Sequence, residues 1–186
     1  MTDPDTRDSA TEDETGYALP IGTLDDARAL VGRRTPPRPA PAEVSWGRIQ
    51  HFCSMTRDGN PSYWDPETAK ELWGGIVAPP AMLEAWLMPL EWTPTSDAPQ
   101  PRLPARIPLP GRSMINGSND TTFHRPVHIG DLLTVEEELL SVSDLKSTRL
   151  GDGHFVETLS VFRNQDGEVV AEVRNTLFRF TPGEGT

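Results

Sequence analysis

The sequence predicts an α+β domain in which an antiparallel sheet wraps around one buried helix. The helix is expected at residues 76–90, where Glu84 is the only charged residue. A helix with so little polar surface has to be enclosed by the rest of the fold. The sheet is expected from four later stretches with the composition of strands, at 116–127, 132–142, 154–164 and 168–181. The last two are joined by Gln165-Asp166-Gly167, a hairpin-turn sequence that makes them antiparallel neighbours.

Length, charge and cysteine content limit the classes of protein this chain can belong to. A length of 186 residues allows one domain with a substantial core and is too short for two ordinary ones. Cys53 is the only cysteine, so no intramolecular disulfide is possible and a reducing compartment is favoured. A net charge of −11, without a basic stripe, argues against nucleic-acid binding. No stretch has the pattern of a signal peptide or a membrane span, so we expect a cytoplasmic protein that binds no membrane.

The first 41 residues are expected to lie outside the folded domain. Residues 1–16 are rich in acidic side chains and nearly devoid of apolar ones, so they predict a disordered tail. A short helix is expected from an N-cap at Thr23 to a terminating Gly32. Residues 33–41, rich in proline and arginine, predict an extended connector. The domain is then expected at 42–182, with a C-terminal tail at 183–186.

Short helices and loops are expected between the connector and the strands. Apolar spacing predicts a short helix at 44–55 and another at 67–72, separated by a loop with turn-forming residues at 56–61. After the buried helix, residues 91–112 form a proline-rich stretch and predict a long loop. That loop carries Arg102, Arg106 and Arg112.

The loop before the buried helix has a distinctive sequence. Residues 58–63 read Asp-Gly-Asn-Pro-Ser-Tyr, and residues 75–82 read Gly-Ile-Val-Ala-Pro-Pro-Ala-Met. Farther along, residues 122–127 read Thr-Phe-His-Arg-Pro-Val, and Gly130 and Asp131 follow. Together these segments resemble the MaoC-like family of hotdog hydratases. In that family the loop reads Asp-x-Asn-Pro-x-His and precedes the buried central helix.

The resemblance covers roughly residues 42–182 and implies a single hotdog fold. It is strongest to the FAS1-like dehydratase type, and in particular to the larger chain of heteromeric steroid enoyl-CoA hydratases of actinobacteria. In such assemblies one hotdog subunit supplies the catalytic pair, and the other shapes the acyl pocket. Some of these larger chains continue into a DUF35-type domain. The resemblance therefore implies a CoA thioester as substrate and a second hotdog chain, or a second copy of this one, as partner.

Two catalytic elements of the family are altered here. Hydration of an enoyl thioester needs a held water, a proton donor and a stabilised thioester oxygen. Asp58 keeps the family's aspartate, but Tyr63 stands at the histidine position, and a phenol with a pKa near 10 is a poor base at neutral pH. Pro80 matches the position whose backbone N–H faces the thioester oxygen, and proline has no N–H. These differences favour a subunit that binds acyl-CoA without a complete catalytic site.

The resemblance also implies which residues contact the substrate. For the acyl thioester these are Asn60, Val77, Ala78, Pro79, Pro80, Met82 and Trp86, although Met82 and Trp86 are better explained as core residues. Arg102, Arg106 and Arg112 suit the phosphates of CoA, or they merely keep a loop soluble. Without the resemblance, Asp58 is explained as a turn residue and Tyr63 as a packing aromatic. His51, His128 and His154 lack neighbours of metal-ligating type, so neither a metal nor a cofactor is expected.

Three further functions remain open from the sequence. The chain is alternatively a self-sufficient MaoC-like dehydratase that uses Asp58 with Tyr63, or a non-enzymatic acyl-CoA-binding scaffold that recruits a DUF35-like domain or a thiolase. A thioesterase is the weakest alternative, since one fold hosts several chemistries.

Overall fold

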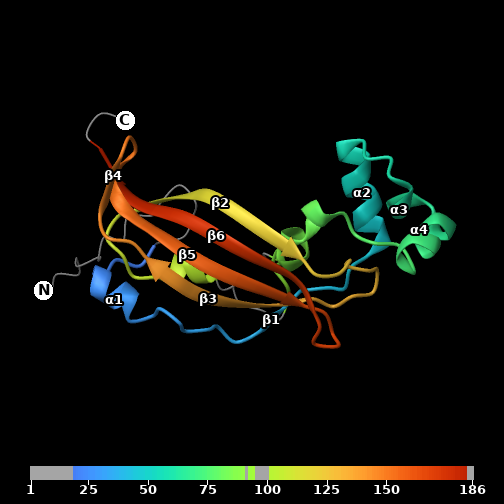
Figure 1. The fold of residues 1–186 in the computed structure, drawn as a ribbon, viewed down its shortest axis with the longest axis horizontal. Helices are drawn as coiled ribbons and strands as arrows, with labels where there is room; N and C mark the ends of the chain where they lie inside the picture. Colours follow the sequence, from blue (N-terminus) through green and yellow to red (C-terminus); the bar gives the residue numbers. More distant parts are fainter. Residues whose placement is uncertain (1–18, 91, 95–100, 184–186) are drawn as a thin grey trace, which may run out of the picture.

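The structure is a computed structural model that describes residues 19–90, 92–94 and 101–183. Its centre is one antiparallel sheet with the strand order β1-β3-β5-β6-β2, in which the short β4 pairs with β5 (Figure 1). The strands are β1 (Arg38–Pro39), β2 (Ser113–Phe123), β3 (Thr134–Val142), β4 (Lys146–Thr148), β5 (Gly151–Arg163) and β6 (Val169–Pro182).

The four expected strands are confirmed as β2, β3, β5 and β6. The hairpin between β5 and β6 is also confirmed: Gly167 has a φ of 79°, and Asn164 Oδ1 accepts from Asp166 N and Glu168 N at 3.1 and 3.0 Å. One neighbour relation differs from a simple meander, because β2 pairs with β6, the last strand, and not with β3. The edge β2 is exposed along nearly its whole length.

Three helices gather beyond one end of the sheet, where β2 ends (Figure 1). They are α2 (Trp46–Thr56), α3 (Pro61–Trp64) and α4 (Pro66–Trp73), and both short helices expected at 44–55 and 67–72 are therefore confirmed. Asn60 and Asp65 cap α3 and α4, each accepting from the backbone N–H two residues on. This pattern is a capping role that asparagine and aspartate side chains commonly take.

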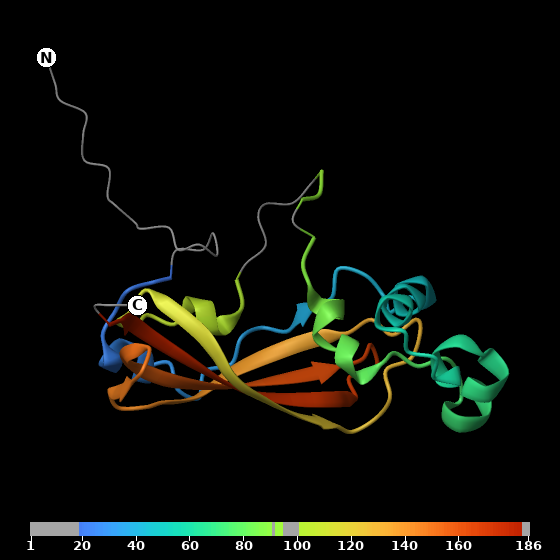
Figure 2. The ribbon, with the colours of Figure 1, turned by 90° about the horizontal axis from the view of Figure 1, so that it is seen from above.

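The buried helix expected at 76–90 is the main point at which the structure differs from the sequence prediction. The segment is buried as expected, but it forms two 3₁₀ turns, η1 (Pro80–Met82) and η2 (Glu84–Leu87), instead of one long α-helix. Pro79 and Pro80 have no backbone N–H, so at the start of the first turn the chain bonds only from Met82 N to Pro79 O, at 2.9 Å. At the other end, Met88 has an extended ψ of 120° just before Pro89, a position that disfavours helix. The central helix of the fold is therefore unusually short, and beyond Leu87 the chain rises away from the sheet (Figure 2).

The N-terminal segment belongs to the folded domain, so the boundary expected at residue 42 is too late. The helix expected after Thr23 is present as α1 (Leu24–Arg28), with Thr23 and Asp26 forming a reciprocal capping box. Ala27 of α1 is fully buried in a cluster with Ile107, Leu109, Leu139, Val142 and Val156. Residues 32–40 are extended and follow β3, to which β1 is hydrogen-bonded. The tail expected to be disordered, 1–16, lies outside the described residues.

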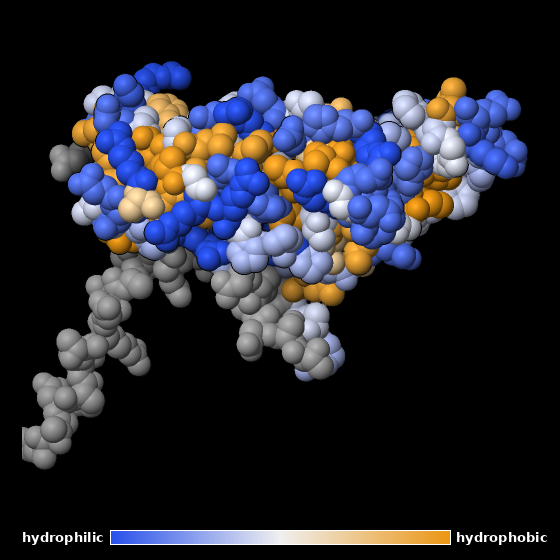
Figure 3. All heavy atoms as spheres, turned by 60° about the horizontal axis from the view of Figure 1, so that its bottom comes forward, coloured by the Kyte–Doolittle hydropathy of each residue, from blue (hydrophilic) through white to orange (hydrophobic). Residues whose placement is uncertain are grey.

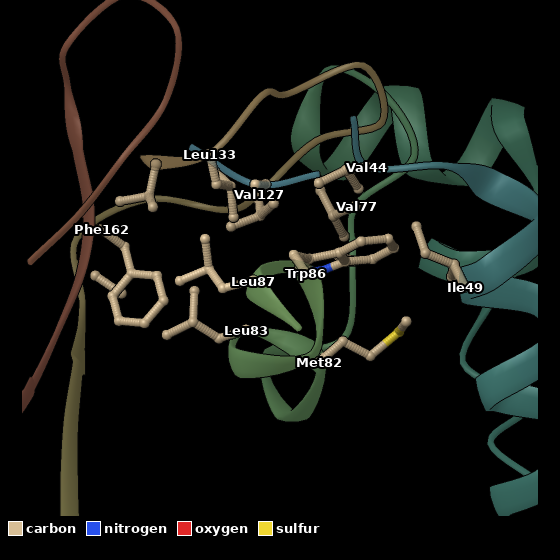
Figure 4. Close-up of a cluster of buried hydrophobic side chains, with 14 of the residues drawn as sticks. Val44, Ile49, Val77, Met82, Leu83, Trp86, Leu87, Val127, Leu133 and Phe162 are labelled. Carbon is tan, nitrogen blue, oxygen red and sulfur yellow. The ribbon is translucent and has the colours of Figure 1, made fainter. Parts of the chain in front are cut away.

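The larger core cluster joins the two turns to the sheet and to α2 (Figure 4). Trp86 is completely buried, and Met82, Leu83 and Leu87 are nearly so. Figure 4 shows the Trp86 indole between Val77 and Met82. These side chains cover only one face of the sheet.

No described segment of the chain covers the outer face of the sheet (Figure 2). Phe155 is 37% exposed there, and a salt bridge of 2.7 Å joins Arg174 to Glu157. Figure 3, which views this face obliquely from the side of β1 and β3, shows hydrophobic and hydrophilic residues side by side. Among the described residues, no helix is long and apolar enough to cross a membrane.

Candidate functional site

The loop with the family-like sequence is built as a series of turns at the C-terminus of α2. Arg57 adopts a left-handed conformation with a φ of 56°, and the Asp58 N–H donates to Cys53 O at 2.9 Å. Asp58 then accepts from Asn60 N, and Asn60 accepts from Ser62 N, both at 3.0 Å. The local Asx turns thus fix the direction in which Pro61 starts α3.

Three tryptophan indoles hold this loop in place. The hydrogen bonds run from Trp46 Nε1 to Tyr63 O at 2.9 Å, from Trp64 Nε1 to Asp58 O at 2.8 Å, and from Trp73 Nε1 to Ser62 Oγ at 3.0 Å. Each indole comes from a different part of the helical cluster, so the loop is tied to α2, α3 and α4 together. A loop held by this many directed bonds has little freedom to rearrange.

A cavity of about 380 Å³ opens between this loop, the two 3₁₀ turns and the end of β2. We call it the Tyr63 pocket. Its lining consists of Asn60, Ser62, Tyr63, Trp73, Val77, Ala78, Pro79, Pro80, Leu83, Trp86, Phe123, His124, Arg125, Pro126 and Val127. Most of the wall is apolar, which is typical of a pocket that encloses a small organic ligand.

The structure thus brings together six of the seven residues expected at the acyl thioester. Met82 is the exception, because it packs in the core and is absent from the pocket wall. Pro80 occupies the first position of η1 and offers no N–H. The nearby Ala78 N–H is already used, since it donates to Val127 O at 2.7 Å. The start of the turns therefore presents no N–H donor at Pro80 or Ala78.

Tyr63 is buried in the pocket wall, with 8% of its surface exposed. Burial is the main cause that raises its pKa above the ordinary 10.0, and the negative charge of Asp58 raises it further. Both effects disfavour the phenolate. At neutral pH the Tyr63 hydroxyl is therefore protonated and acts as a hydrogen-bond donor.

Asp58 is in a different position from the one an acid–base residue needs. Asp58 is half-buried, and its carboxylate accepts from Asn60 N within the loop. It does not line the pocket. It is close enough to Tyr63 and to the buried Cys53 for its charge to raise the pKa of each. Asp58 thus stabilises the loop through a hydrogen bond and raises the pKa of two neighbours without lining the pocket.

The three arginines expected near CoA do not line the Tyr63 pocket. Arg102 forms salt bridges with Glu84 and with Glu137, the latter at 2.9 Å, and donates to Ser160 Oγ at 3.0 Å. Burial lowers the pKa of Arg102, but the two carboxylates more than offset this and leave the pKa above its ordinary value.

Arg106 and Arg112 are exposed near the opposite end of the sheet. Arg112 directly precedes β2, whose 11 residues span about 33 Å before Phe123 reaches the pocket.

A second cavity of about 340 Å³ lies on the inner face of the sheet between η2 and η3 (Leu103–Arg106). We call it the sheet pocket. It is lined by Glu84, Arg102, Pro104, Ala105, Met114, Asn116, Asn119, Thr158, Ser160, Val173, Asn175 and Leu177. Sequence reasoning missed it. The available signal was a run of small polar residues at inward positions of strands, of which Thr158 and Ser160 are almost completely buried.

Sequence reasoning also missed the contribution of the end of β2 to the Tyr63 pocket. His124 Nε2 lies 2.9 Å from Glu172 Oε2, and Arg125 forms a salt bridge with Glu168. The basic side chains in the pocket wall, His124 and Arg125, therefore each already face a carboxylate. In the described part of the chain, no three His, Cys, Asp or Glu side chains gather closely enough to hold a metal ion.

Comparison with known proteins places these features in a family. Residues 29–173 match the family model described as "FAS1-like, dehydratase domain region". A relative from Thermomonospora curvata, named "Probable enoyl-CoA hydratase alpha subunit", is 35% identical over 162 residues, which cover 83% of this chain and 51% of the relative. Another from Mycobacterium tuberculosis, named "3-oxo-4,17-pregnadiene-20-carboxyl-CoA hydratase alpha subunit", is 29% identical over 167 residues, covering 87% and 53%. The chain spans about half the length of these curated relatives.

Solved structures agree with the family model. A chain in the crystal structure of the ChsH1-ChsH2 complex from Mycobacterium tuberculosis superposes with a TM-score of 0.71 and 25% identity, covering 87% of this chain and 92% of that one. MaoC-like dehydratases of known structure have the same fold. The chain therefore belongs to the FAS1-like dehydratase family, with the hotdog fold of the MaoC-like dehydratases.

Proposed function

We propose that this chain is the acyl-CoA-binding subunit of a heteromeric enoyl-CoA hydratase, and that a second hotdog chain supplies the catalytic aspartate and histidine. The observation that carries the proposal is Tyr63, a buried and protonated phenol at the position of the family's base. Asp58 is engaged with Asn60 N, and Pro80 has no N–H for a thioester oxygen. Water activation and oxyanion stabilisation are therefore both missing from this chain's own loop.

The exposed strand β2 is the surface we assign to the partner. Its 11 residues pair with β6 on one side only, and no described residue pairs with the other side. Such an edge is a ready template for a strand of another chain. The names of the two curated relatives as alpha subunits, and the two-chain crystal structure, support an assembly of this kind.

The short central helix leaves room for a bulky acyl group. The sheet pocket lies beside Glu84 in η2, on the inner face that a continuous helix would be expected to cover. Its floor combines Leu177 and Val173 with the hydroxyls of Thr158 and Ser160. This mixture suits a large, mainly apolar acyl group with a few oxygen substituents, and the steroid in the name of one relative belongs to that class.

The remaining parts of the proposal concern the setting of the assembly. The substrate is a CoA thioester, no cofactor takes part, and hydration occurs in the cytoplasm. A DUF35-type domain or a thiolase is a further candidate partner, since the curated relatives are about twice as long as this chain.

The proposal is tested by measuring hydration of an enoyl-CoA with this chain alone, with its partner alone, and with both together. The candidate partner is a hotdog protein with an intact Asp…His loop, to be sought in the reading frames next to the one that encodes this chain. We expect activity from the mixture, with at most a trace from this chain alone. Changing the partner's histidine to alanine should abolish the activity, whereas Tyr63→Phe in this chain should leave it within about twofold.

Two results would count against this assignment. Turnover by the lone chain that disappears in Tyr63→Phe and Asp58→Asn would instead establish a self-sufficient enzyme. Tight acyl-CoA binding without hydration in any mixture would establish a scaffold module.

A further inference from the structure

The edge strand β2 contains the pair Asn116-Gly117, and Asn116 is the only asparagine of the chain that is followed by glycine. Asparagine side chains are chemically labile, because the backbone nitrogen of the next residue can attack their amide carbon. Glycine has no Cβ, so it obstructs this close approach least. The local sequence therefore places the least hindered nucleophile beside this one asparagine.

The structure places the pair at a β-bulge. Asn116 lies opposite Leu177 of β6. The next register pair is Ser118 with Thr176, which leaves Gly117 without a partner residue. The extra residue of a bulge stays outside the ladder and disrupts it locally. A Cβ at Gly117 would lie 3.0 Å from Thr176 O, so the bulge itself favours glycine at this position.

The strand is held on one side only at this point. β2 pairs with β6, and no described residue pairs with its other edge. Asn116 and Gly117 are both exposed. An edge strand with an interrupted ladder opens locally at a smaller free-energy cost than a central strand. Such opening lets the Gly117 nitrogen turn toward the Asn116 side chain.

The Asn116 amide is also activated toward attack. Its Oδ1 accepts from Asn175 Nδ2 at 2.8 Å. Attack on the amide carbon places negative charge on this oxygen, and a hydrogen-bond donor stabilises that charge. Asn175 Nδ2 donates to Asn119 Oδ1 as well, so the exposed Asn119 shares the strand and the donor. Asn119 is followed by Asp120 instead of glycine and is therefore an internal comparison.

We propose that Asn116 is a site of spontaneous conversion to aspartate and isoaspartate, and that pairing of β2 with another chain protects it. The Gly117 nitrogen loses its proton to solvent base and attacks Asn116 Cγ. The bond from Cγ to Nδ2 breaks, ammonia leaves, and a cyclic succinimide remains. Water then opens the ring at either carbonyl, which gives aspartate or isoaspartate. The sequence of steps needs no oxidant or reductant.

Both products change the surface that β2 presents. Asn116 lines the sheet pocket, so either product adds one negative charge there. Isoaspartate also routes the backbone through the side-chain carboxyl group and lengthens the strand by one methylene group. This lengthening shifts the later residues of β2 relative to a pairing strand. A chain that stays unpaired therefore loses its pairing edge with time, and only this consequence rests on the proposed function.

The test incubates the isolated full-length chain in mildly alkaline buffer and follows each asparagine by proteolysis and mass spectrometry. A synthetic peptide of residues 113–121 gives the rate for a fully open strand. We expect Asn116 in the folded chain to react within about 30-fold of the peptide rate, which corresponds to an opening cost of at most about 2 kcal/mol. Asn119 should react at least about tenfold more slowly than Asn116, because its next residue has a side chain.

The control variant is Asn116→Gln, because glutamine closes a larger ring and reacts more slowly. It should abolish the isoaspartate that isoaspartate methyltransferase detects, and circular dichroism confirms that it is folded. The inference is overturned if Asn116 reacts more than about 30-fold more slowly than the peptide, or no faster than Asn119.

A second measurement adds the hotdog partner to the same incubation. We expect the bound partner to slow the reaction at Asn116 by at least about tenfold, because pairing closes the free edge of β2. An active complex that gives no such protection would overturn the protective role of pairing while the division of labour between subunits stands. Failure of the mixture to hydrate an enoyl-CoA would instead remove the proposed function, and the reactivity of Asn116 in the lone chain would be unaffected.

Discussion

The Arg102 salt-bridge cluster gives the sharpest prediction of stability. Glu137 has only 5% of its side chain exposed and accepts from Arg102 Nε at 2.9 Å and from Leu103 N at 3.1 Å. Arg102→Met would leave this carboxylate buried without its cation. Breaking a fully buried pair costs about 3–5 kcal/mol. Because 40% of the Arg102 side chain is exposed, we expect about 2–3 kcal/mol here, a fall in Tm of about 4–12 °C.

The matched comparison is Glu84→Gln. It removes the other carboxylate of Arg102, but Glu84 has 45% of its side chain exposed, and exposed pairs contribute only about 0–1 kcal/mol. Urea unfolding followed by circular dichroism at neutral pH measures both losses. The double variant Arg102→Met/Glu137→Met should lose less than the sum of the two single changes, because no buried charge is left unpaired. Equal losses for Glu84→Gln and Arg102→Met, or simple additivity in the double variant, would refute the reasoning.

Four other measurements follow from the structure. The pKa of Tyr63 is raised in the folded state, so the protonated phenol contributes its full stabilisation below about pH 10. This stabilisation is lost as the pH rises through the folded-state pKa. The free energy of unfolding of Tyr63→Phe should therefore depend less on alkaline pH than that of the unchanged protein. Gly47→Ala in α2, where a Cβ meets open space, should stabilise the fold by about 0.5–1 kcal/mol. Gly111→Ala should destabilise the fold by at least about 2 kcal/mol, because φ is +95° and the new Cβ would lie 2.6 Å from the backbone of Phe180. Gly32→Ala is its control, because φ is +79° there but no atom lies near the new Cβ. In a thermal melt this control should show the conformational cost alone, about 1 kcal/mol. Replacing Arg106 and Arg112 by serine should change the Kd for acyl-CoA less than twofold by calorimetry, because both side chains are exposed, and a loss of about tenfold would establish them as CoA ligands.

The strands and capped helices could be predicted from the sequence because their signals are local. The turn residues at 165–167 fixed the β5–β6 hairpin, and Thr23 marked the start of α1. Segment 76–90 was correctly predicted to be buried because it is nearly free of charge, but its two 3₁₀ turns were not predicted. Burial alone does not distinguish one α-helix from two 3₁₀ turns, and the prolines at both ends favoured the shorter forms.

The part of the site formed by the loop could be predicted from the loop's own sequence. The part formed by segments distant in the sequence was missed. Asn60, Tyr63 and Pro80 follow one another closely in the chain, so their shared location could be inferred. Phe123 and Val127 reach the same pocket from the end of β2, a contact that depends on the strand order. The pairing of Arg102 with Glu137, 35 residues away, likewise has no local signal in the sequence. The sequence therefore suggested the phosphates of CoA as the partner of the Arg102 charge.

The two edges of the sheet are not equivalent. The segment 32–40 lies along β3. The N–H groups of Gly32 and Thr35 donate to carbonyls of that strand, and Ala40 N donates to Leu133 O just before it. Pro36, Pro37 and Pro39 of this segment have no N–H with which a further strand could pair. A further strand cannot be added easily to such a border. Among the described strands, β2 has the longest edge without a partner, so we expect strand addition to occur there. Pairing of β2 with the β2 of a second copy would give a closed pair of chains, because both free edges would then be used.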